Sequence, residues 1–292
     1  MDITKKSFMD GFSWVTNAIK ACLPKAPSFI VVSVLATIVF SILVLLITFV
    51  GALFAKIPVI GIIISLAVLL LTAILSLGFY CGYLKAIQTI LNDGKVSFGS
   101  FFFALKDKQF LIKILPFAII LGLTCALIVG AFGYLSYLAI VSTGSKVLFY
   151  ICLVVMLVLL VIVMIYGTYS LILFIQRNDH KIMATLKDTA NGLLKNITSI
   201  IGMYIGLLAI SIVTNFIAQA LTNLIIGSPN PSVAMAVVVF VVLIVIYCIV
   251  GMISVATLCL SAKEIFVENS DGASFSEEQP AAVEQNNDES NN

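Results

Sequence analysis

Charged residues are spaced along this chain so that five long segments contain none. The segments are 26–55, 57–84, 114–145, 147–176 and 196–262. A hydrocarbon layer about 30 Å thick needs about 20 apolar helical residues to cross it. Each of the first four segments is long enough for one crossing, and the turn-forming run 227–232 divides the last one in two. The spacing predicts six transmembrane helices, near 28–54, 59–84, 114–142, 147–175, 197–226 and 233–261.

Composition supports a fold inside a membrane. Of the 292 residues, 61% are hydrophobic and 10% are charged, whereas a soluble domain carries about 25% charged residues. The long segments show no polar–apolar alternation of the kind that marks barrel strands. Helices satisfy their own backbone groups in lipid, so we expect an all-α integral membrane domain over 1–267. Residues 268–292 are acidic and rich in Asn, Ser and Gln, which predicts a disordered tail.

The basic residues also predict an orientation. If the chain crosses six times, fourteen of the sixteen Lys and Arg residues lie on one side, and only Lys56 and Lys146 lie on the other. Cytoplasmic loops carry the excess of Lys and Arg. We therefore expect both termini in the cytoplasm. No secretory signal peptide is visible, so the first span should remain in the mature protein.

Each odd-numbered span follows a stretch with apolar residues at helical spacing. These stretches are centred on Phe12, Phe101 and Leu186. Amphipathic helices of this kind lie in the membrane interface with the apolar face toward lipid. The sequence thus predicts three hairpins, each preceded by a cytoplasmic interfacial helix. The unit is either a true parallel repeat about the membrane normal or simply three hairpins with similar charge placement.

Small residues four apart occur in three of the predicted spans. They are Gly78 and Gly82, then Gly122, Ala126 and Gly130, and finally Gly202 and Gly206. Such spacing lets helix backbones approach closely. Static packing within one bundle is the favoured interpretation, and a sliding or gating interface is the alternative. A homo-oligomer or another membrane protein also remains open as a partner.

The fifth span carries a polar stripe formed by Ser211, Asn215, Gln219 and Asn223, with Thr222 beside it. Polar side chains in hydrocarbon need partners, so the stripe should face the bundle interior or a wet cavity. The stripe either forms interhelical hydrogen bonds, worth about 0.6 kcal/mol each, or provides a surface for binding or permeation. No Asp, Glu, Lys, Arg or His lies within a predicted span, which disfavours a proton-coupled pump.

Signals for catalysis, metals or cofactors are weak. The six cysteines form no C-x-x-C pair and are expected to behave as small hydrophobes. His180, Asp107 and Asp188 are the best acid–base candidates, but solvated loop charge explains them more simply. No common catalytic or phosphate-binding motif occurs. The sequence predicts no enzyme, no cofactor and no metal.

Lysines beside the apolar segments point to lipid headgroups rather than to nucleic acid. The candidates for contact with anionic lipid are Lys106, Lys108, Lys113, Lys187 and Lys195. A basic residue close to an anionic membrane surface contributes about 1 kcal/mol to its attraction. Membrane lipid with anionic headgroups is therefore the expected partner.

Several local features occur together in this chain: Pro58 to Gly61, then Gly78 and Gly82, then the run from Asn92 to Phe102, and an amphipathic helix with Phe12 and Trp14 before the first span. In these features the chain resembles the bacterial YciC-like family of multi-pass membrane proteins. Relatives in that family include the membrane domain of some glycerophosphodiester phosphodiesterases. The resemblance implies a bacterial cytoplasmic membrane and about six spans, and it supplies no catalytic residues. We expect an envelope, lipid-related or scaffolding role, with a permease or exporter subunit as the alternative.

Overall fold

The computed structural model describes residues 2–54, 57, 60–142, 144–177, 181–226 and 232–267. Within them, six helices are long and apolar enough to cross a membrane. They are α2 (Ala26–Phe54), α3 (Ile60–Asp93), α6 (Lys108–Val141), α7 (Lys146–Gln176), α9 (Ile197–Ile226) and α10 (Val233–Ile265). The predicted tail at 268–292 lies outside the described residues.

Shorter elements connect or flank these helices. They are β1 (Asp2–Ile3), α1 (Phe8–Cys22), η1 (Leu23–Lys25), α4 (Phe98–Phe101), α5 (Phe103–Lys106), α8 (Ile182–Lys195) and β2 (Phe266–Val267). The short helix expected around Phe101 is broken at Phe102 into α4 and α5, and the Ser97 side chain makes no capping hydrogen bond. Helix α3 continues past the predicted end of its span because helical hydrogen bonding need not stop where the hydrocarbon ends.

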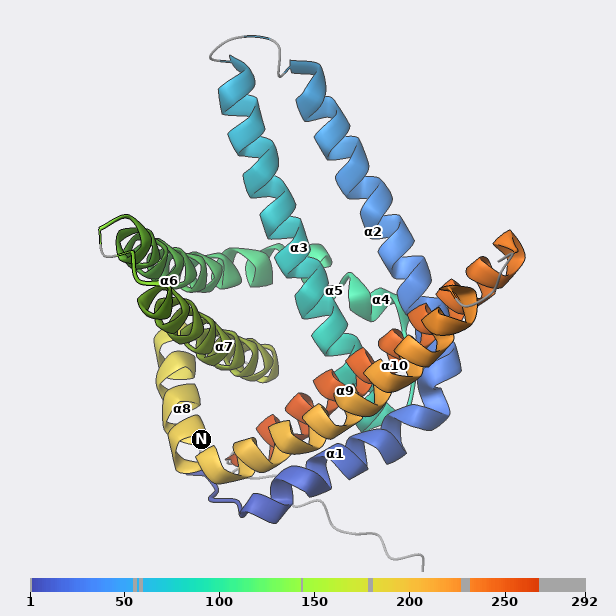
Figure 1. Ribbon diagram of the computed structural model, residues 1–292. Coiled ribbons are helices and arrows are strands. Elements are labelled where there is room, and N and C mark those ends of the chain that lie inside the picture. The colour runs from blue at the N-terminus through green and yellow to red at the C-terminus, as the bar shows by residue number, and fades with distance from the viewer. Residues whose placement is uncertain are drawn as a thin grey trace, which may run out of the picture.

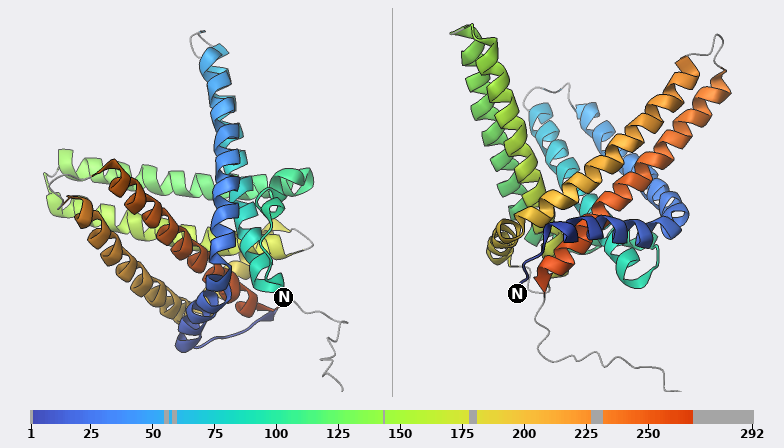
Figure 2. Two further views of the ribbon diagram at one scale, coloured as in Figure 1. Left: turned by 90° about the vertical axis from the view of Figure 1, so that its right-hand side faces the viewer. Right: turned by 60° about the horizontal axis from the view of Figure 1, so that its bottom comes forward.

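The long helices are arranged in three pairs that diverge from a shared base (Figures 1 and 2). Helix α2 packs along α3, α6 along α7, and α9 along α10. We call each pair a leg, and we call the short helices together with the adjoining leg ends the base. Thirty helical residues extend about 45 Å, which exceeds the hydrocarbon thickness, and divergence of the legs would tilt them to fit.

The short helices pack against the ends of the three legs. Helices α4 and α5 pack on α3, α8 packs on α7, and α1 packs on α9 and α10. Each short segment therefore contacts the leg that precedes it in the chain, and α1 contacts the last leg. As a result, each leg is held at the base by at least one short helix that packs against it.

The buried core lies in the base, whereas the outer parts of the legs are exposed. Trp14, Leu84, Tyr169 and Met252 have no exposed surface. Leu127, on α6 toward the far end of its leg, is 73% exposed, and many neighbouring leg residues are similar. Apolar exposure on this scale is untenable in water, so the legs require hydrocarbon around them.

Helix α1 is positioned by a capping box and by its apolar face. The Ser7 backbone N–H donates to Asp10 Oδ2 at 2.6 Å, and the Asp10 N–H donates to Ser7 Oγ at 3.4 Å. The Ser7 N–H and the Ser7 hydroxyl, which also donates to Asp10 Oδ2, stabilise the carboxylate and hold the pKa of Asp10 below its usual value. The apolar side, expected to face lipid, instead packs on α9 and α10 and buries Trp14 and Cys22. Burial raises the pKa of the Cys22 thiol to about 11, which fits its role as a small hydrophobe.

Both ends of the described chain meet at the base. Strands β1 and β2 pair antiparallel. The ammonium group of Lys6 lies 3.0 Å from Glu264 Oε2. Asn196, which is fully buried, accepts from the Lys6 N–H at 2.7 Å and donates through Nδ2 to the Thr4 carbonyl at 2.9 Å. The amide of one side chain thus ties the N-terminal segment to the junction of α8 and α9.

Candidate functional site

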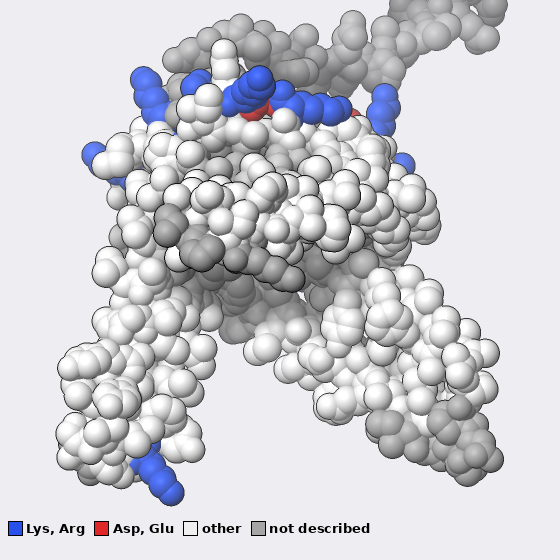
Figure 3. Space-filling model, turned by 90° about the horizontal axis from the view of Figure 1, so that it is seen from above, with Lys and Arg blue, Asp and Glu red and all other residues white. Residues whose placement is uncertain are grey.

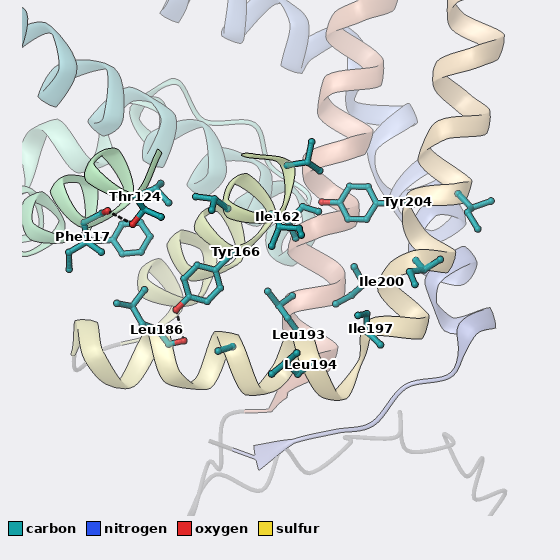
Figure 4. A pocket seen from close by; sticks show the side chains of 18 of the residues that line it. Phe117, Thr124, Ile162, Tyr166, Leu186, Leu193, Leu194, Ile197, Ile200 and Tyr204 are labelled. Atoms are coloured by element: carbon teal, nitrogen blue, oxygen red, sulfur yellow. Dashed lines mark hydrogen bonds between the residues drawn. The ribbon is translucent and has the colours of Figure 1, made fainter. Parts of the chain in front are cut away.

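An apolar cavity of about 930 Å³ lies between α6, α7, α8 and α9. We call this space the cleft (Figure 4). It is lined by side chains from all four helices, among them Phe117, Leu121, Ile162, Tyr166, Leu186, Leu193, Ile200, Tyr204 and Leu208. Helix α8 runs across one end of the cleft, because it leaves α7 at the base and leads directly into α9.

Polar contacts attach α8 to α7 and to its C-cap residue Arg177 beside the cleft, among them two short ones. The Tyr166 hydroxyl donates to the Leu186 carbonyl at 2.8 Å (Figure 4). Arg177 Nη1 lies 2.9 Å from Asp188 Oδ2, and both side chains are largely shielded from solvent. A charged pair of this kind fixes the angle between two helices, since either partner left alone would be a poorly solvated charge.

The cleft offers a ligand almost no polar chemistry. Its polar side chains are Thr124, Tyr166 and Tyr204. The Thr124 hydroxyl donates to the Ile120 carbonyl of its own helix at 2.8 Å, and the Tyr166 hydroxyl is used by α8. Such a lining suits a hydrocarbon chain.

The polar stripe of α9 continues the cleft wall toward the far end of its leg. Ser211, Asn215, Gln219 and Asn223 are exposed in the single chain, and the Asn215 amide donates to the Ser211 carbonyl at 2.9 Å. Residues four apart share a helix face, so Asn215 follows Leu208 and Ser211 on the face that begins with Tyr204. Thr222 is partly buried and bonds to the Ala218 carbonyl. The stripe was expected to face a bundle interior or a wet cavity, and within one chain its four residues are exposed.

Two of the small-residue motifs pack against short helices rather than against another span. A Cβ on Gly82 would lie 1.8 Å from the Phe101 carbonyl oxygen, and one on Gly78 would lie 2.5 Å from the Leu105 side chain. A Cβ on Gly202 would lie 2.4 Å from the Phe8 carbonyl oxygen, while Gly206 faces Val15 of α1. These glycines therefore assemble the base. The sequence alone could not identify their partners.

The third motif has no partner in the described chain. Nothing lies within 4 Å of a Cβ built at Gly122 or Gly130. Ala126 is exposed on the same helix. This side of α6 is therefore open to lipid or to another protein.

Lysines gather at the base, where the legs converge (Figure 3). The five lysines predicted to contact anionic lipid, Lys106, Lys108, Lys113, Lys187 and Lys195, are all exposed. Lys195 also donates to the Ile3 carbonyl. Lys146 begins α7 at the far end of its leg, and Lys56 lies outside the described residues. The molecule thus has one strongly basic end.

The acid–base candidates serve structural purposes. Asp107 Oδ1 accepts hydrogen bonds from the N–H groups of Gln109 and Phe110, both at 3.0 Å, and caps α6. Asp188 pairs with Arg177. His180 lies outside the described residues. Among the residues that the structure describes, no group of three His, Cys, Asp or Glu side chains could hold a metal ion, and all six cysteines are free.

The chain matches no protein-family model, no curated protein and no solved structure. Its class therefore rests on its own fold. The six long apolar helices define a multi-pass integral membrane protein. The cleft could not be predicted from the sequence, because four helices form its walls and no local pattern encodes how these helices are placed relative to one another. The sequence feature that points to the cleft is the apolar stripe of α8, which we expected to face lipid.

Proposed function

We propose that this chain is a non-catalytic protein of the bacterial cytoplasmic membrane with a lipid-related or scaffolding role. In this proposal both termini are cytoplasmic, and the legs are three transmembrane hairpins that rise from a base at the inner surface. The observation that carries it is the concentration of lysines at the base, opposite the apolar legs. The resemblance to YciC-like proteins points to the same membrane.

The base suits contact with anionic headgroups. Its exposed lysines lie beside helices that run across the ends of the legs rather than along them. Each lysine near an anionic membrane surface contributes about 1 kcal/mol of attraction. The pairing of β1 with β2 also brings the two ends of the described chain together on this side, as an even number of crossings requires.

The absence of a catalytic role is supported by what the aspartates do. Asp107 caps a helix and Asp188 forms an ion pair. Each carboxylate thus has a structural contact in the described chain. In the base, these acidic groups therefore hold helices in place, as expected of a scaffold.

The experiment replaces Lys106, Lys108, Lys113, Lys187 and Lys195 together with glutamine. The affinity for anionic phospholipid, measured by co-purification in mild detergent, should fall by about three orders of magnitude, because about 1 kcal/mol is removed at each of the five positions and each step of about 1.4 kcal/mol is tenfold. Arginine at the same five positions preserves the charge and should preserve the lipid. Unchanged anionic lipid in the glutamine variant would refute the role of the base.

A permease or exporter subunit remains the second candidate, because the α9 stripe follows the cleft wall. Asn215→Leu combined with Gln219→Leu should abolish solute flux in proteoliposomes while the helix content stays the same. The control is Ser254→Ala on α10, since that hydroxyl bonds only to the Val250 carbonyl of its own helix. Unaltered flux in the double variant would exclude the stripe as a permeation surface.

A further inference from the structure

We propose that the cleft is a binding site for one anionic phospholipid, with acyl chain between the α6–α7 leg and α9 and headgroup phosphate between Lys113 and Lys187. The proposal rests on the proposed function in one respect, namely that α8 lies at the inner membrane surface. It adds a discrete site, a stoichiometry and two headgroup ligands to the general attraction of the base for lipid.

The lining and size of the cleft fit a hydrocarbon chain. Its volume of about 930 Å³ falls within the range of about 300–1,000 Å³ typical of ligand pockets. An empty space of this size would deprive its lining of dispersion contacts. Because the Thr124 and Tyr166 hydroxyls are already bonded within the protein, a polar solute would find few partners there. Acyl chain is the material that a membrane supplies to such a space.

Two lysines share helix faces with residues that line the cleft. Lys113 precedes Phe117 by one helical turn, so it shares the face of α6 that lines the cleft. Lys187 precedes the lining residues Ala190 and Leu194 by three and seven residues, so it shares their face of α8. Both side chains are exposed, and neither forms an ion pair with another described residue. Basic pockets between membrane helices on the cytoplasmic side are suited to anionic headgroups.

The neighbouring carboxylates do not compete for these lysines. Asp188 is adjacent to Lys187 in sequence, but its carboxylate is held by Arg177 at 2.9 Å. Asp107, at the start of α6, accepts two backbone N–H groups at Oδ1, and among the described residues it forms no ion pair with either lysine. The positive charge at the mouth of the cleft is therefore available to a phosphate.

The test fills the cleft with a side chain. Ala190 lines it on α8, and Ala190→Trp should lower the occupancy of the phospholipid retained in mild detergent about tenfold or more, equivalent to about 1.4 kcal/mol. Native mass spectrometry with phosphatidylglycerol should show one retained lipid per wild-type chain. The matched control is Ala67→Trp, at an exposed position of α3 in another leg, which should retain that lipid. Should Ala190→Trp fail to fold by circular dichroism, Ala190→Leu carries the same expectation with less added volume.

The headgroup ligands are tested separately. Lys113→Gln with Lys187→Gln should reduce the preference for phosphatidylglycerol over phosphatidylcholine about thirtyfold, because each lysine contributes about 1 kcal/mol. Lys20→Gln with Lys25→Gln removes the same charge from α1 and η1, which do not line the cleft, and should leave the preference intact.

Two outcomes would overturn the site. Unchanged lipid occupancy in the folded Ala190 variant excludes the cleft, even where the five-lysine variant loses anionic lipid and the proposed function survives. A wild-type mass of two chains that becomes one in Ala190→Trp would mean that a second copy fills the cleft. Loss of lipid from Ala190→Trp with no effect of any lysine variant would remove the headgroup ligands and the proposed function, but not the acyl-chain site.

Discussion

The base and the legs are built from similar residues, yet they differ in what surrounds those residues. Trp14, Tyr169 and Met252 in the base are fully enclosed by protein. In the legs, Leu69 and Leu127 are about as apolar but are 69% and 73% exposed. In lipid there is no hydrophobic penalty for such exposure, and helix association depends on packing and hydrogen bonds. The base therefore holds the protein together, while the legs are free to contact lipid or partners.

The largest expected difference between the two regions comes from aromatic truncation. Trp14→Ala should lower the free energy of unfolding by about 3–5 kcal/mol, because it leaves a cavity in an enclosed site. Phe240→Ala, at a leg position that is 64% exposed, should change it little. Titration with sodium dodecyl sulfate measures both variants. Equal losses would show that the legs are packed as tightly as the base.

The same glycine-to-alanine change, made once in the base and once in a leg, tests the comparison between the two regions further. Gly82→Ala places a Cβ 1.8 Å from the Phe101 carbonyl oxygen, and overpacking of this kind costs about 1–3 kcal/mol. Gly122→Ala meets nothing within 4 Å and should be neutral or slightly stabilising. Thermal unfolding in detergent distinguishes the two variants. A destabilised Gly122→Ala would instead reveal a partner on α6.

The ion pair between α7 and α8 should show a smaller effect. Asp188→Asn leaves Arg177 without its carboxylate and should cost about 1.5 kcal/mol, the lower end for hydrogen bonds to charged groups. Asp93→Asn, at an exposed position near the end of α3, is the control. Hydrogen exchange should rise in α8 in the first variant only. Exchange that stays the same in α8 would mean that its other contacts, among them the Tyr166 hydrogen bond, are enough to hold this helix.

The smallest effect is expected from acidification at the start of α1. The pKa of Asp10 is lowered by its hydrogen bonds with Ser7, so the carboxylate stabilises the helix above its ordinary pKa of about 3.9. This stabilisation is lost as the pH falls through the lowered value. Asp10 is partly exposed, so the change should be confined to a lower hydrogen-exchange protection factor, corrected for the intrinsic pH dependence of exchange, in the first turn of α1. Asp10→Ala should show low protection at every pH, and a protection factor that still changes with pH there would assign the response to another group.

Local sequence features predicted several elements because their causes are local. The charge-free segments led to six long apolar helices, since each helix satisfies its own backbone. Helix α3 ends just before Gly94, which has a φ of 63° that suits glycine. By contrast, the helix expected around Phe101 is divided at Phe102, and its two parts, α4 and α5, pack against Gly82 and Gly78 of α3.

The candidate site was only partly predictable. The lysines and the polar stripe could be found from residue type and spacing, and the stripe residues are exposed in the single chain. The cleft could not be found, because it depends on how far the α6–α7 leg lies from α9. That separation is set by α8, whose attachment uses Tyr166 and the ion pair of Arg177 with Asp188.

By itself the sequence determined that the chain enters a membrane, because hydropathy and charge spacing act segment by segment. It also determined that one end of the molecule is basic. Only the tertiary structure decided that α1 covers α9 and α10, that two of the glycine motifs serve the base, and that a cleft opens beside α8. The physical reason is that lipid satisfies an apolar helix face as well as protein does. Which faces meet is therefore decided by shape and a few polar contacts between residues far apart in the chain.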